Sequence, residues 1–160
     1  MIKPTLLDAY FLDVATHILS HTDSNKRFAY NIDELKAGKR ETHPCLAPTM
    51  ALDEVRAPLE YNGGWKGVNS HGFWILKHVE KQDWANENVV VQECNAMAQK
   101  TLSKMTYEFA NEGDTIMKFL DPRSMEVRKV GPELDTFFGV YVSYALRQTV
   151  DLTYNASDWT

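Results

Sequence analysis

The segment that most constrains the fold is residues 137–146, which has the composition of a β-strand that is apolar or aromatic on both faces. Successive side chains of a strand point to opposite faces of a sheet. One face would carry Phe138, Val140, Val142, Tyr144 and Leu146, and the other Phe137, Tyr141 and Ala145, with Gly139 and Ser143 between them. A strand with one face in water alternates apolar and polar residues instead. We therefore expect one face to cover a core and the other to meet a second surface.

Two segments show helical periodicity. In residues 5–20, apolar side chains recur at spacings of four, three and four, at Leu7, Phe11, Val14 and Ile18. Residues 83–109 carry a longer apolar stripe, formed by Val90, Cys94, Met97, Ala98, Thr101, Leu102, Met105 and Phe109. This stripe fits a period of about 3.6 residues over roughly five turns. Residues 116–120 indicate one or two further helical turns, which Asp121 and Pro122 would close.

Four further segments indicate strands, and one indicates a loop. Residues 28–32, 44–52, 71–79 and 124–130 have strand composition. Pro44 and Pro48 predict an edge strand or the start of a strand, because proline cannot donate to a ladder. Residues 57–70 are the most glycine-dense part of the chain and predict a mobile loop that carries Trp65.

The order of these elements predicts a single α+β domain over residues 1–150. We expect an antiparallel or mixed β-sheet, with the N-terminal helix and the long central helix packed on one face. A chain of 160 residues suits one domain, and residues 151–160 are polar enough to be a C-terminal tail. The two long amphipathic helices can cover one sheet face and leave the other for a partner.

The sequence offers no convincing metal or thiol site. A zinc site needs four ligands, usually in close pairs, and His43 with Cys45 has no second pair beside it; His71, His78 and Cys94 lie elsewhere. A catalytic thiolate needs an activating neighbour, and nothing marks either cysteine in this way. We expect no metal and no cofactor, and two buried thiols suit a reducing cytoplasm.

Other catalytic patterns are equally weak. The run from Asn62 to Gly67 lacks the spacing of a phosphate-binding loop. The acidic pairs Asp53 with Glu54, and Glu80 with Asp83, fit solvated turns, because acid–base work needs carboxylates that converge in an apolar pocket. We therefore expect a structural protein rather than an enzyme.

The charge and hydropathy of the chain argue against two classes of partner, nucleic acids and membranes. The formal net charge is −5, which disfavours nucleic-acid binding through clustered Lys and Arg. No run of about 18 apolar residues predicts a membrane span, and residues 1–4 lead into an amphipathic helix rather than the apolar region of a signal peptide. We expect neither sequence-specific nucleic-acid binding nor a membrane.

The order of elements over residues 5–149 resembles that of the small head–tail connector and tail-completion proteins of tailed bacteriophages and prophages, with tail terminators as the most similar type. It consists of the N-terminal helix, the proline-bearing strand, the strand and long helix of residues 73–109, and a closing hairpin through Gly131 and Pro132. The long 57–70 segment and the 151–160 extension depart from that pattern.

The resemblance implies a structural virion protein whose sheets meet in a ring, commonly of six subunits, at the tail end or neck. Its partners would be copies of itself and other tail or neck proteins, in the virion and in the host bacterial cytoplasm during assembly. The residues that would form the subunit interface are Phe137, Tyr141, Trp65 and Trp159.

Two other hypotheses remain open. One is a small-molecule-binding or enzymatic α+β domain, with Trp74, Tyr141 and Tyr144 lining a pocket. The other is a cytoplasmic adaptor that binds a protein through an exposed sheet edge.

Overall fold

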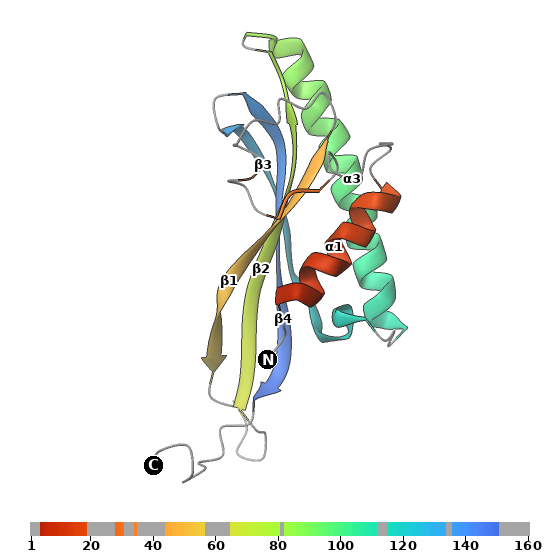
Figure 1. The fold of residues 1–160 in the computed structure, drawn as a ribbon, viewed down its shortest axis with the longest axis vertical. Helices are drawn as coiled ribbons and strands as arrows, with labels where there is room; N and C mark the ends of the chain where they lie inside the picture. Colours follow the sequence, from red (N-terminus) through yellow and green to blue (C-terminus); the bar gives the residue numbers. More distant parts are fainter. Residues whose placement is uncertain are drawn as a thin grey trace.

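A computed structural model describes residues 4–18, 28–30, 34, 44–56, 65–80, 82–111, 115–133 and 136–150, with only the backbone for 4, 5, 50–56, 65–67, 69, 132, 133 and 148–150. Figure 1 shows a sheet with helices on one side. In chain order the elements are helix α1 (Pro4–Ile18), strands β1 (Cys45–Arg56) and β2 (Trp65–His78), helix α3 (Trp84–Ala110), the 3-10 helix η2 (Ile116–Phe119), and strands β3 (Leu120–Glu133) and β4 (Phe137–Val150).

The four strands form one antiparallel sheet in the order β1-β2-β4-β3. The central strands β2 and β4 pair along their whole length, from Trp65 opposite Val150 to His78 opposite Phe137. Strand β1 lies at an edge, one of the two positions that the prolines allow, and it contains Pro48 while Pro44 directly precedes it. Strand β3 forms the other edge. The expectation of a single α+β domain with an antiparallel or mixed sheet is confirmed.

Both long helices pack on the same face of the sheet (Figure 1). Their side chains bury the first face of β4, where Val142 and Leu146 are completely inaccessible to solvent. The main core cluster joins Phe11 and Val14 of α1 to Val90 and Met105 of α3 across this face, as the sequence pattern predicts, and further members come from β1, β2 and η2.

Helix α3 follows directly from its sequence. Asp83 caps it, because its side chain accepts a hydrogen bond from the backbone N–H of Asn86 at 3.2 Å. The predicted stripe faces the sheet, with Val90, Cys94, Ala98, Thr101 and Met105 buried. Phe109, at the end of the stripe, stays 36% exposed because the helix runs past the core there. Burying a side chain such as Met105 stabilises the fold by about 1.5 to 3 kcal/mol.

Part of the predicted glycine loop is strand. Strand β2 begins at Trp65; residues 65–70 pair with β4 on one side, and residues 66–69 pair with β1 on the other. Gly67 lies between Val55 and Gln148 in this ladder, so cross-strand pairing overrides the local preference of glycine for loops. Residues 57–64 lie outside the described residues.

Two other segments differ from expectation. The strand expected over residues 28–32 is a single parallel bridge between Phe28 and Leu46, with the Ala29 N–H donating to the Leu46 carbonyl at 2.9 Å; residues 31–33 lie outside the described residues. Strand β3 begins at Leu120, earlier than expected, because Asp121 continues the ladder opposite Ala145. Its register shifts between Asp121 and Glu126.

Three strand ends extend past the helices. Pairing between β3 and β4 stops at Leu120 opposite Leu146, whereas β1, β2 and β4 continue together to residues 56, 65 and 150. In Figure 1 this three-stranded ribbon projects below the layer formed by α1 and α3. The ribbon therefore has no helical cover from these two helices.

Candidate functional site

The second face of the sheet carries a pair of aromatic rings in contact, tilted by 42° to each other. Trp74 of β2 and Tyr141 of β4 are directly opposite each other, and their ring centroids lie 4.5 Å apart. The Tyr141 ring lies on the backbone of Gly72, where an added Cβ would come within 2.6 Å of Tyr141 Cε2. The Tyr141 and Thr49 hydroxyls are 3.4 Å apart. We call Thr49, Gly72, Trp74 and Tyr141 the aromatic patch.

The aromatic patch is only partly covered by the chain. Thr49, Trp74 and Tyr141 are half-buried, and so is Ser143, the next residue of β4 on this face. Beside Tyr141 on the edge strand lies Arg128, which is exposed and paired with Glu126 at 2.7 Å. A partner can therefore reach two aromatic rings that the sheet already holds in place, which lowers the entropic cost of binding.

The expectation that the second face has no cover within the chain is wrong around Phe137. This residue is only 6% exposed, because it packs in a second cluster with Ala29, Cys45, Ala47 and Leu76. Its ring also meets His78 edge-on, at 5.7 Å between centroids. Phe137 thus stabilises the subunit and offers little area to a neighbour.

For the other two proposed interface residues, Trp65 and Trp159, the structure describes no side chain. Trp65 starts β2 opposite Val150, and the structure describes only its backbone. Trp159 lies outside the described residues. Among the four predicted interface residues, Tyr141 is the one whose described side chain is partly accessible to solvent. Trp74, which was not among the four, contacts Tyr141 and is also partly accessible.

The proposed pocket of Trp74, Tyr141 and Tyr144 does not form. Tyr144 points to the opposite face from Tyr141 and is 2% exposed, in the core between Phe11 and His71. Burial raises the pKa of Tyr144 well above its ordinary value. Among the described residues, its buried hydroxyl has no hydrogen-bond partner.

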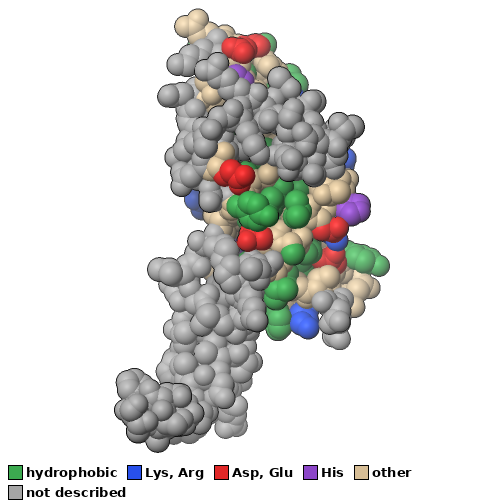
Figure 2. Space-filling view, viewed as in Figure 1, with side chains coloured by type: hydrophobic (Ala, Val, Ile, Leu, Met, Phe, Trp, Pro, Cys, Tyr) green, Lys and Arg blue, Asp and Glu red, His purple; other side chains and the backbone are tan. Residues whose placement is uncertain are grey.

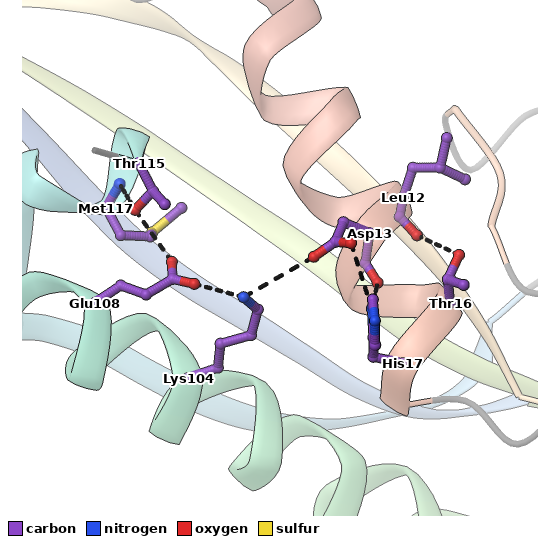
Figure 3. Close-up of polar contacts among 8 residues, drawn as sticks. All are labelled: Leu12, Asp13, Thr16, His17, Lys104, Glu108, Thr115 and Met117. Carbon is purple, nitrogen blue, oxygen red and sulfur yellow. Dashed lines mark hydrogen bonds and ion pairs between the residues drawn. The ribbon is translucent and has the colours of Figure 1, made fainter. Parts of the chain in front are cut away.

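A cluster of charged side chains lies where α1, α3 and η2 meet (Figure 3). Lys104 Nζ is 2.5 Å from Glu108 Oε1 and 3.9 Å from Asp13 Oδ2, so it links α3 to α1. The other oxygen of Glu108 accepts a hydrogen bond from the Thr115 hydroxyl at 3.1 Å, just before η2. Lys104 also lies 5.5 Å from the centroid of the Tyr10 ring.

This cluster fixes the helices rather than presenting a reactive group. Glu108 is held by a cation and a hydroxyl, and burial, followed by the Glu108 charge, raises the pKa of Tyr10. A tyrosine whose pKa is raised is a poor base at neutral pH. The sequence analysis missed the cluster, although the four-residue spacing of Lys104 and Glu108 on a helix indicates the first pair.

The described structure does not bring the two thiols together, and it does not group residues that could bind a metal ion. Cys45 and Cys94 are both buried, in two different hydrophobic clusters. Burial raises the pKa of the Cys94 thiol to about 12, so the reactive thiolate is scarce near pH 7. Within the part of the chain that the structure describes, no three His, Cys, Asp or Glu residues are grouped as a metal site would require.

Surface character is mixed over the described side chains. Figure 2 shows one face of the molecule, on which apolar side chains lie among acidic and basic ones. No described helix combines the length and apolar character that crossing a membrane requires. Neither a protein-family model nor a curated protein matches the chain.

Proposed function

We propose that this chain is a structural subunit of a phage or prophage particle, which forms an oligomeric ring at the tail end or neck as a tail terminator or head–tail joining protein. The observation that carries the proposal is a sheet covered by helices on one face, with a half-buried aromatic patch on the other. The order of elements over residues 5–149 supports it, because it resembles that of tail-completion proteins.

The physical argument rests on surfaces that one subunit leaves uncovered. Apolar surface gains about 25 cal/mol for each Å² that a neighbour buries. Trp74 and Tyr141 offer such surface in a rigid arrangement, and aromatic anchors contribute most of the binding free energy at many interfaces. The three-stranded ribbon beyond the helices gives a neighbouring subunit a second place to pack.

The charge of the chain is compatible with this role. A net charge of −5 opposes adhesion of DNA to a ring through which DNA passes. The partners would be copies of the chain and other tail or neck proteins, in the virion and, during assembly, in the bacterial cytoplasm.

Replacing Tyr141 by Asp tests the aromatic patch. The proposal expects wild-type protein to form rings in native mass spectrometry and negative-stain electron microscopy. The Tyr141→Asp variant should stay folded by circular dichroism and lose the ring, because a carboxylate would be desolvated at the interface. Tyr107→Asp is the matched control, since Tyr107 is 69% exposed on α3 and away from the patch.

Three results would count against the proposal. The first is that wild-type protein stays monomeric and forms no rings, even when it is mixed with tail-tube protein. The second is that both variants lose the rings equally. The third is that the Tyr141→Asp variant unfolds. Gene neighbourhood gives an independent test. Capsid, portal or tail-tube genes beside this one support the role, and metabolic neighbours oppose it.

A small-molecule-binding domain is the second candidate, and the buried hydroxyl of Tyr144 favours it. A buried hydroxyl without a partner is costly, and a bound polar molecule would relieve that cost. A crystal structure would decide between the candidates, because density for an organic molecule against the Tyr144 hydroxyl supports this one and ordered water there opposes it.

A further inference from the structure

Strand β3 exposes the middle of its free edge. It pairs with β4 on one side and ends the sheet on the other. Four consecutive residues in its centre are exposed: Glu126, Val127, Arg128 and Lys129. Val127 is 37% exposed although its neighbour across the ladder, Val142, is fully buried. An apolar residue at an exposed edge is a site at which a further strand can add.

The opposite edge is less suited to pairing. Strand β1 contains Pro48, which has no N–H to donate, and Leu46 already forms a bridge to Phe28. Its register shifts between Met50 and Asp53. Strand β3 also contains prolines and register shifts, but Pro122, Pro132 and both shifts lie outside the exposed residues 126–129, where its pairing with β4 is regular. A further strand would therefore add more readily to this part of β3 than to β1.

We propose that two copies of this chain pair through β3, antiparallel, about a two-fold axis that passes through Val127. The two four-stranded sheets then form one continuous eight-stranded sheet. The proposal concerns a different surface from the aromatic patch and does not depend on the proposed function.

The charges select this register. In a continuous sheet, opposite residues must lie on the same face, so a two-fold pairing is centred on a residue. Centring on Glu126 places two carboxylates opposite each other, and centring on Arg128 places two guanidinium groups opposite each other; like charges in these positions are destabilising. Centring on Val127 places each Glu126 opposite Arg128 of the second copy.

The same register extends the apolar core. Phe73, Val142 and Val127 occupy successive strands in one row across the sheet. With Val127 on the axis, this row continues into Val127 and Val142 of the second copy. The exposed side chain at the edge is then buried against an identical one. On the other face, Glu126 and Arg128, which are 2.7 Å apart within one chain, each gain a second ion-pair partner.

The contact should be weak and reversible. Register shifts between Asp121 and Glu126, and again between Val130 and Glu133, limit the regular part of β3 to a few residues. A short, charged edge strand buries little surface compared with a permanent dimer interface. We therefore expect monomer and dimer to exchange in the micromolar range, on the order of 100 µM.

Charge exchange gives the sharpest test. The Glu126→Arg variant has cations at both position 126 and position 128, and the Arg128→Glu variant has anions at both. Each alone should self-associate at least tenfold more weakly than wild type in sedimentation velocity, whereas an equimolar mixture should form a heterodimer. The mixture does not restore the ion pair within either chain, so recovery reports contact between chains. Glu80→Arg and Lys100→Glu, at exposed positions away from β3, are the matched controls and should not change association.

Cysteine cross-linking tests the register and works even if larger rings form. In the proposed pairing the two Val127 Cβ atoms lie about 4.5 to 5.5 Å apart. Val127→Cys should therefore form an intermolecular disulfide under mild oxidation. Lys129→Cys should not, because its position lies four residues from its own counterpart, or roughly 13 Å along the strand. The native thiols of Cys45 and Cys94 are buried and do not compete.

The results of these two experiments distinguish pairing through β3 from its absence. Heterodimers from the mixture, with cross-linking at position 127 and little at position 129, support the pairing. A monomeric wild type at about 1 mM, a mixture without heterodimers, or equal cross-linking at both positions overturns it. A ring that survives both charge variants overturns the β3 contact without affecting the proposed function, since Tyr141→Asp tests that surface separately.

Discussion

Replacing Gly139 by alanine should destabilise the protein strongly, because the backbone of β2 lies against this position. A Cβ added to Gly139 would overlap the carbonyl oxygen of Ile75 and lie 3.1 Å from the Cα of Leu76. Both are backbone atoms, so rotation of a side chain cannot relieve the overlap. The central strands β2 and β4 must move apart instead.

The magnitude follows from two costs. Overpacking a well-packed interior costs about 1 to 3 kcal/mol. Separating the strands also weakens at least one ladder hydrogen bond, worth about 0.5 to 1.5 kcal/mol. We expect Gly139→Ala to lower the free energy of unfolding by about 2 to 4 kcal/mol, a large part of the roughly 5 to 15 kcal/mol that stabilises a typical domain.

Urea denaturation followed by tryptophan fluorescence measures this loss. With a slope of about 2 kcal/mol per molar urea, the midpoint should fall by about 1 to 2 M. Gly72→Ala is the control, because the atoms that its Cβ would meet belong to the Tyr141 side chain, which can rotate away. We expect a smaller cost there, about 1 kcal/mol. A loss below 1 kcal/mol for Gly139→Ala, or equal losses for both variants, would refute the reasoning.

Two further predictions concern buried ionisable groups. Lys104→Met should lower the free energy of unfolding, measured by urea denaturation, by about 1 to 2 kcal/mol, because it removes the cation beside Glu108, whose side chain is only 13% exposed. Adding Glu108→Gln to this variant should recover part of the loss, because it removes the unpaired charge. The pKa of Cys94 is raised from 9.0 to about 12, so the unfolded chain loses this proton first and stability falls as pH rises from 9 toward 12. Cys94→Ala should show a shallower decline between pH 8 and 10.5, and parallel declines would contradict this.

Local sequence patterns predicted the elements that depend on periodicity. The stripe through Val90, Cys94 and Met105 indicated α3 because a helix brings those positions onto one face. Alternation likewise assigned Val142 and Tyr144 to the core face of β4, where both are buried.

Features that depend on distant contacts were not predictable in this way. The start of β2 at Trp65 depends on its pairing with Val150, while the nearby glycines indicate a loop. Phe137 is buried by residues from β1, β2 and the segment near Ala29, and no local pattern reports their approach. The contact between Lys104 and Asp13 could not be predicted from the sequence either, because it depends on how α1 and α3 cross.

The sheet order has a consequence for synthesis. Trp65 and Val150 are paired at one end of the two central strands but lie 85 positions apart in the chain. At about 5 to 20 residues per second, a ribosome needs roughly 4 to 17 s to make the intervening chain. Until then β2 can pair only with β1, and a two-stranded hairpin that carries Phe73 and Ile75 is marginally stable and prone to aggregate. The nascent chain should therefore depend on chaperones during this interval more than the finished protein does.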